Sequence, residues 1–146
     1  MENKLIFIPF NVPSLKNSKI KTSRGIFPSK TVKSYLTKLG IQRYSASRKE
    51  VIEYKTRPNI IEELRHQFNK SLEGKTPPVE IGFHFVRNTK HKFDFNNANQ
   101  IIADLLTAHK IIEDDNMDCF IPYAFKMNDK FYTIDKENPG VYLMIK

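Results

Sequence analysis

Six of the sixteen acidic residues of this chain lie between positions 93 and 118. They are Asp94, Asp104, Glu113, Asp114, Asp115 and Asp118. Carboxylates at close range repel one another unless a cation or water screens them. Oxygen ligands suit Mg²⁺ or Mn²⁺, and acidic sites that hold these ions commonly catalyse phosphodiester cleavage. This acidic segment is therefore the first candidate for catalytic chemistry.

A helix through this segment places three polar side chains on one face. Asn97, Gln100 and Asp104 are three and four residues apart, so they share a polar stripe opposite the isoleucines and leucines of the same helix. The spacing also fits a simpler alternative, in which an amphipathic helix is followed by a solvated acidic turn.

The two ends of this helix supply the candidate metal ligands. Asp94 and Asn96 alternate in an extended stretch at the helix entrance, where the helix dipole favours an anionic group. If the chain turns back after the helix, Asp114 or Asp115 returns to the Asp94 end. Carboxyl and amide oxygens could then hold a divalent ion that activates a water and stabilises a leaving 3′ oxygen.

Charge is distributed unevenly over the rest of the chain. The net charge is +8, and residues 1–60 hold 13 Lys/Arg against 3 acids, whereas residues 61–146 hold 11 against 13. A basic half beside an acidic segment predicts a polyanionic partner such as nucleic acid, held next to a cation site. The alternative is a generally lysine-rich solvated surface.

Composition excludes several other classes of protein. The chain has 40% hydrophobic residues in 146, which predicts one folded domain over residues 1–146. Cys119 is the only cysteine, so no internal disulfide or cysteine zinc site is expected. No apolar run is long enough to cross a bilayer, no signal segment is visible, and no glycine-rich phosphate loop occurs. These features favour a reducing cytoplasm.

Hydrophobic periodicity predicts the elements that position the acidic segment. We expect strands over residues 4–10, 79–86, 119–127 and 141–145, with strict alternation making 79–86 half-buried. Helices are expected over 29–40, over 59–72, and from Asn96 or Asn97 as N-cap to His109. Residues 14–28 read as a loop or hairpin with its bend near 23–25, and residues 41–57 are ambiguous. The predicted class is α+β, a mixed sheet with helices packed against it.

The same residues resemble a known family. The runs Phe93-Asp94-Phe95-Asn96-Asn97, Asp104-Leu105-Leu106 and Ile112-Glu113-Asp114-Asp115 are similar to the signature of RusA-type Holliday junction resolvases. That signature is an Asp-x-Asp-Asn opening a helix, a lysine four residues beyond the second Asp, an Asp-x-Leu near the helix end, and an Asp-Asp pair about ten residues later. The N-terminal basic stretch and the closing strand after Pro139-Gly140 are similar too, although only the middle block is specific.

The resemblance implies a RusA-like fold and a small homodimeric, Mg²⁺-dependent (or Mn²⁺-dependent) endonuclease, often encoded by a prophage, that cuts four-way DNA junctions in recombination and repair. By position, Asp94 and Asp115 match metal-binding catalytic aspartates, and Asp104 and Asp114 match acidic positions around them. Two positions depart from the family pattern. Asn96 replaces the second Asp and offers a metal an oxygen without a charge. Gln100 replaces the lysine and can bond to a phosphate without neutralising it.

Basic residues in two loops, with one asparagine beside them, are the candidate contacts to DNA. They are Lys16, Asn17, Lys19, Lys21, Arg24, Lys90 and Lys92. For the first loop, an exposed flexible segment is the alternative. Two functions therefore stay open: a junction-resolving endonuclease, and a branched-DNA-binding or regulatory protein that keeps the fold but does not cut.

Overall fold

In the computed structural model, the described residues are 5–14, 19–22, 25–45, 48 and 50–146. The strands are β1 (Leu5–Pro9), β2 (Lys19–Thr22), β3 (Gly25–Pro28), β4 (Ile41–Ser45), β5 (Glu50–Glu53), β6 (Val79–Arg87), β7 (Phe120–Ala124), β8 (Tyr132–Ile134) and β9 (Gly140–Ile145). The helices are α1 (Lys30–Lys38), α2 (Ile60–Glu63), α3 (Arg65–Leu72) and α4 (Phe95–Ala108).

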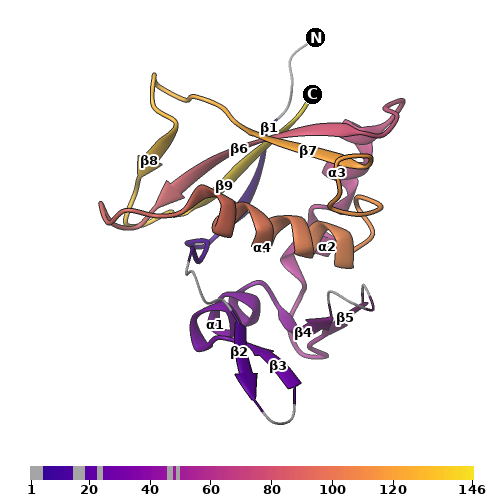
Figure 1. Ribbon diagram of the computed structural model, residues 1–146, viewed down its shortest axis with the longest axis vertical. Coiled ribbons are helices and arrows are strands. Elements are labelled where there is room, and N and C mark those ends of the chain that lie inside the picture. Colours follow the sequence, from indigo (N-terminus) through magenta and orange to yellow (C-terminus); the bar gives the residue numbers. More distant parts are fainter. Residues whose placement is uncertain (1–4, 15–18, 23–24, 46–47, 49) are drawn as a thin grey trace.

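The main sheet has five strands and is mixed. Its order is β1-β9-β6-β7, and β8 also pairs with β6, beyond the end of β7. β9 runs antiparallel to both β1 and β6, whereas β7 and β8 run parallel to β6. Figure 1 shows α4 crossing between this sheet and a part formed by α1 and two small hairpins. The predicted α+β class with a mixed sheet is confirmed.

Strand β6 is the centre of the sheet, and it is buried on both faces. We expected it to be half-buried, but Glu80 is the only one of its residues that is exposed. On one face, the rings of Phe83 and Phe85 pack against Phe95 of α4, with centroid distances of 6.2 and 5.7 Å. On the other face, the ring of Phe125 lies 5.8 Å from that of His84. The half-buried prediction was wrong because the chain after β7 covers the second face.

Helix α4 begins earlier than its sequence suggested. Its N-cap is Asp94, not Asn96 or Asn97, since the Asp94 side chain accepts hydrogen bonds from the backbone N–H groups of both asparagines. Aspartate is among the best N-cap residues. The end of the helix fits the prediction, because His109 is its C-cap.

The N-terminal half follows most of the expectations. Residues 14–28 contain the hairpin β2–β3, with Thr22 paired to Gly25, although Ser23 and Arg24 at its bend lie outside the described residues. The ambiguous residues 41–57 form a second hairpin, β4–β5. The helix expected over 59–72 is divided at Leu64 into α2 and α3.

Buried side chains join these parts into one core. A single hydrophobic cluster includes Ile8 of β1, Phe83 of β6, Ile102 of α4 and Leu36 of α1. The core thus extends from the sheet, through α4, to the far side of the molecule. None of the described helices is both long and apolar enough to cross a membrane.

Candidate functional site

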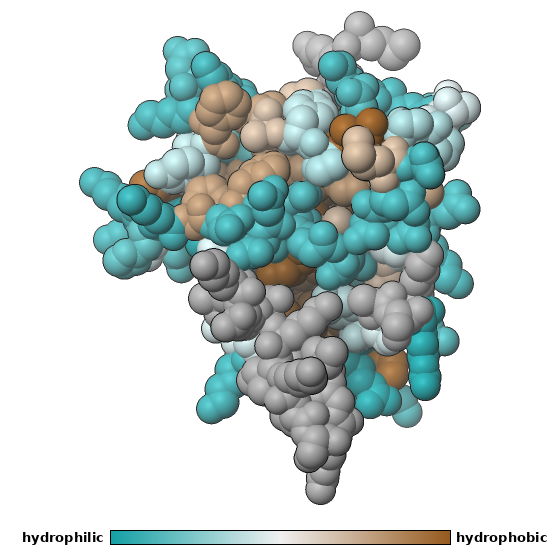
Figure 2. Space-filling view, in the orientation of Figure 1, coloured by the Kyte–Doolittle hydropathy of each residue, from teal (hydrophilic) through white to brown (hydrophobic). Residues whose placement is uncertain are grey.

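The exposed side of α4 brings two carboxylates together through one amide. Gln100 Nε2 donates hydrogen bonds to Asp104 Oδ1, at 2.8 Å, and to Asp115 Oδ2, at 2.7 Å. Gln100 and Asp104 are one helical turn apart, as the spacing predicted. Asp115 arrives from the turn after the helix. In Figure 2, hydrophilic side chains cover the middle of this face, where α4 runs in Figure 1.

Asp94 lies at the start of the same helix. Its Oδ1 accepts from the backbone N–H of Asn96 at 2.9 Å and from that of Asn97 at 3.3 Å. Six residues separate it from Gln100, which corresponds to roughly 9 Å along the axis at 1.5 Å per residue. The acidic turn therefore brings Asp115 back along α4 as far as Gln100, in the second turn of the helix, and not as far as Asp94.

Among the other predicted site residues, Asn97 and Asp114 have hydrogen bonds of their own. The side chain of Asn97 donates to the backbone carbonyl of Ser14 at 3.4 Å, which ties the β1–β2 connection to the first turn of α4. Asp114 Oδ1 accepts from the backbone N–H of Asp115 at 2.8 Å, which shapes the acidic turn. Asn96 is exposed beside Asp94.

The carboxylates do not form a closed metal cage. In the described ranges, no group of three or more His, Cys, Asp or Glu side chains is arranged to hold a metal ion. Mg²⁺ in phosphate-processing sites is usually held by one or two carboxylates, with waters and substrate phosphates completing its shell. The Asp104–Asp115 pair matches that smaller donor set. If the Gln100 side-chain amide rotated by 180°, its Oε1 in place of Nε2 would face Asp104 and Asp115, and the site would gain a third oxygen ligand.

Tyr44 of β4 lies near enough to Asp104 for that carboxylate to act on its phenol, and sequence reasoning missed it. Burial, together with the nearby Asp104 carboxylate, raises the pKa of Tyr44. Its hydroxyl is therefore protonated at neutral pH and available as a donor. No alternation of apolar and polar residues marks β4, because Ile41 and Tyr44 are three residues apart and the register shifts between Ile41 and Arg43.

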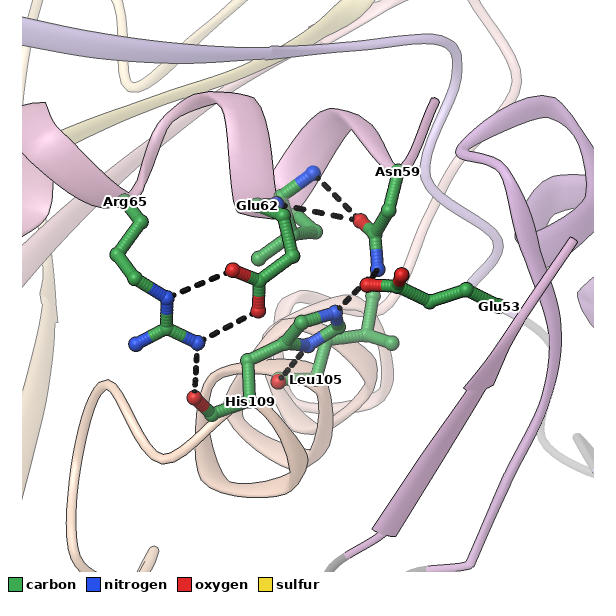
Figure 3. Close-up of polar contacts among 7 residues, drawn as sticks. Glu53, Asn59, Glu62, Arg65, Leu105 and His109 are labelled. Atoms are coloured by element: carbon green, nitrogen blue, oxygen red, sulfur yellow. Dashed lines mark hydrogen bonds and ion pairs between the residues drawn. The ribbon is translucent and has the colours of Figure 1, made fainter. Parts of the chain in front are cut away.

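A polar network fixes the end of α4 from which the acidic turn departs (Figure 3). His109 Nδ1 donates to the carbonyl of Leu105, and His109 Nε2 accepts from Asn59 Nδ2 at 2.9 Å. Asn59 also caps α2, through hydrogen bonds from two backbone N–H groups, and donates to Glu53. This arrangement requires the neutral imidazole with its proton on Nδ1.

Arg65 completes this network from the other side. It donates to both oxygens of Glu62, at 2.7 and 2.6 Å, and also to the carbonyl of His109 (Figure 3). Cations at a helix C-terminus stabilise its unpaired carbonyls. The hydrogen bond with Arg65 lowers the pKa of Glu62. The end of α4, and with it the departure point of the 110–118 turn, is therefore held by side chains of α2 and α3.

A buried arginine at the end of β6 fixes the opposite end of α4, and sequence reasoning missed it. Arg87, 8% exposed, donates to the carbonyl of Val12 and lies 4.6 Å above the ring of Phe93. A longer contact of 3.5 Å joins it to Ser14 Oγ. Arg87 thus holds the β1–β2 connection against the residue that precedes Asp94.

The predicted DNA-contact residues are only partly described. Lys90 and Lys92 are exposed in the β6–α4 connection, close in sequence to Asp94. Lys19 and Lys21 are in β2, and the orientation of their side chains is not described. Lys16, Asn17 and Arg24 lie outside the described residues.

Comparison of this chain with protein-family models, with curated proteins and with solved structures finds no match.

Proposed function

We propose that this protein is a Mg²⁺-dependent endonuclease that resolves branched DNA, such as four-way junctions, during recombination or repair in a phage or prophage. The observation that carries the proposal is that Asp104 and Asp115 both accept hydrogen bonds from the Gln100 amide on the exposed side of α4. Two carboxylates of separate segments meet there, in a protein whose net charge is +8. The two carboxylates suit a divalent metal ion, whose remaining ligands can include a phosphate oxygen of DNA. The positive charge of the whole protein favours binding of that DNA.

Each side chain has a distinct role in the proposed reaction. Asp104 and Asp115 would hold the ion, which would supply a water of lowered pKa and stabilise the leaving oxygen. Asp94 lies nearly two turns before Gln100, so it and Asn96 form a separate candidate position for the ion at the helix entrance. Gln100 positions Asp115 through its hydrogen bond at 2.7 Å. Lys90 and Lys92 offset charge on the DNA backbone in place of the lysine that RusA-type proteins carry at the Gln100 position.

Cleavage of a synthetic four-way junction tests this function. We expect product with Mg²⁺ or Mn²⁺, and a loss on the order of 100-fold or more in Asp115→Asn, because removing one charged group from such a site typically has that effect. Asp118→Asn is the matched control, since Asp118 is exposed in the same turn and its backbone N–H bonds to Asn116. Equal rates in the two variants would contradict the assignment of Asp115.

A second function, binding of branched DNA without cleavage, is favoured by one specific observation. The donor end of the Gln100 amide lies between the two carboxylates and already satisfies one oxygen of each. Asn96 removes a further charge from the helix entrance. Under this alternative, the wild type binds the junction and leaves it intact, and Asp94→Asn or Asp115→Asn changes nothing. If the wild type instead cuts weakly, the double variant Asn96→Asp with Gln100→Lys, which restores the family pattern, is expected to raise its cleavage.

Symmetrical cutting of a junction needs two sites, so the proposed active form is a homodimer. Sedimentation velocity on the protein alone and on its junction complex measures this. A complex with a single 17.1 kDa chain per junction would contradict the dimer.

A further inference from the structure

A pocket of about 400 Å³ lies between α1 and the connections that follow β1 and β6. This volume is within the range of small-ligand sites, roughly 300–1,000 Å³. The wall on α1 carries Lys30, Thr31, Ser34 and Lys38, and the facing wall carries Asn11 and Asn88. The pocket is separate from the Gln100 site, whose residues do not line it.

The chemistry of the walls is that of an anion site. Lys30, Ser34 and Lys38 are four positions apart, and Thr31 lies three before Ser34, so the helix presents two ammonium groups and two hydroxyls on one side. Asn11 Oδ1 accepts from the backbone N–H of Asn88 at 3.0 Å, which leaves the Asn11 amide N–H₂ as a donor. No carboxylate is among the described lining residues, and neither lysine pairs with one in the part of the chain that the structure describes.

Tyr35 supplies an independent observation at the floor of this pocket. It lines the pocket, is 3% exposed, and its hydroxyl has no hydrogen-bond partner among the described residues. Buried hydroxyls in native proteins nearly always have a partner, so an orphan of this kind needs an explanation. The hydroxyl oxygen is closed to solvent, so a ligand oxygen in the pocket would become that partner once a local shift of α1 or Tyr35 opens the way to it.

We infer that this pocket binds a backbone phosphate of nucleic acid. The inference deepens the proposed function and rests on it for the choice of nucleic acid over a small phosphate compound. The β1–β2 connection joins the two sites: Asn11 lines the pocket, while the carbonyl of Ser14 accepts from Asn97 in the first turn of α4. A strand held in the pocket would therefore continue towards Asp94. Phosphate contacts of this type fix the register of a nucleic acid and do not read its sequence.

The salt dependence of DNA binding tests the pocket. Lys30→Ala with Lys38→Ala is compared with Lys33→Ala with Lys70→Ala, which removes the same charge from exposed positions that do not line the pocket. Affinity for a labelled duplex and a four-way junction is measured without divalent metal, from about 50 to 200 mM salt. We expect the pocket pair to reduce the slope of log K against log[salt] by about one for each phosphate that is no longer neutralised, equally for both DNAs. The control pair should change it less.

Two further measurements, an inserted carboxylate and a melting curve with inorganic phosphate, distinguish DNA binding in the pocket from other outcomes. Ser34→Asp places a carboxylate in the pocket and should weaken binding more than Asn69→Asp, which makes the same charge change at an exposed position of α3 outside the pocket. Equal slopes for the two lysine pairs overturn the inference. Inorganic phosphate that raises the melting temperature of the wild type but not of the pocket pair, together with equal slopes on DNA, assigns the pocket to free phosphate and also overturns it. The proposed function fails if the wild type neither binds the four-way junction more tightly than the duplex nor cuts it. In that case the salt slopes measured on the duplex still test the pocket.

Discussion

Asp94 combines two roles in one side chain, as the N-cap of α4 and as a candidate metal ligand. Its capping oxygen accepts from two backbone N–H groups, and loss of such a cap costs about 1 kcal/mol. Asparagine caps as well as aspartate does. We therefore expect Asp94→Ala to lower the free energy of unfolding by about 0.5–2 kcal/mol, and Asp94→Asn to leave it within a few tenths.

The pair of Asp94 variants also separates capping from chemistry. If Asp94 holds the metal, junction cleavage falls in both variants, although only the alanine variant is less stable. Urea unfolding and cleavage rates measured on the same preparations provide the comparison. Full cleavage in Asp94→Asn would falsify a catalytic role for this carboxylate.

Arg87 has a structural role that its charge alone does not explain. Its guanidinium donates to the carbonyl of Val12 while stacking on Phe93, and lysine reproduces neither geometry. Burial lowers the pKa of Arg87, but an arginine stays charged at neutral pH. We expect Arg87→Lys to destabilise the fold by about 1–3 kcal/mol, because the Val12 carbonyl loses its donor. Arg43→Lys, on an exposed position of β4, is the control for urea unfolding and should have little effect.

Sequence reasoning found the acidic side chains but not the groups that hold them. Charge and helical spacing were sufficient to place Gln100 beside Asp104. They could not locate Asp115 against Gln100, because that contact depends on the path of the 110–118 turn. Tyr44 and Arg87 were missed for a related reason: their roles come from tertiary contacts with α4 and with Phe93, which no local pattern encodes.

At the scale of elements, the network around His109 makes the end of α4 sensitive to pH. Burial is the main cause that lowers the pKa of His109 below its ordinary 6.5, while its bond to Leu105 acts in the opposite direction. The unfolded chain therefore binds a proton more readily than the folded one. The stability that depends on the neutral imidazole is complete above pH 6.5, and it is lost as the pH falls through the lower folded pKa.

We therefore expect the melting temperature to fall between about pH 7.5 and 5, before most carboxylates titrate. His109→Gln should be less stable at pH 7.5, since it disrupts the bonds to Leu105 and Asn59, but it should show a flatter profile over this range. His66→Gln, at an exposed position of α3, should retain the wild-type profile. Parallel profiles for His109→Gln and the wild type would contradict the assignment.

The elements themselves were mostly predictable, and the errors have physical causes. Strands and helices with strong periodicity, such as β6 and α4, were found in place. The exposure of β6 was wrong, because alternation of residue types cannot reveal that Phe125 and its neighbours cover the second face. The three-residue β8 was missed, since a short edge strand with exposed Tyr132 and Ile134 has little hydrophobic signal.

At the scale of the whole molecule, the continuous core predicts cooperative unfolding, and two glycines test this. Gly40 and Gly74 both have positive φ, at 81° and 76°. A methyl group on Gly40 would overlap the Pro58 carbonyl, whereas one on Gly74 would meet nothing within 4 Å. Gly74→Ala should cost about 1–2 kcal/mol, from backbone strain alone.

Gly40→Ala should cost a further 1–3 kcal/mol or so, because α1 and the segment before α2 must also move apart. Since α1 shares its core with the sheet through α4, this loss should appear in the whole molecule. The far-ultraviolet signal of the backbone and the near-ultraviolet signal of the tyrosines should then shift together, in one transition. Separate transitions in Gly40→Ala would mean that the α1 part unfolds on its own, and that the pocket on α1 is not rigidly linked to the acidic face of α4.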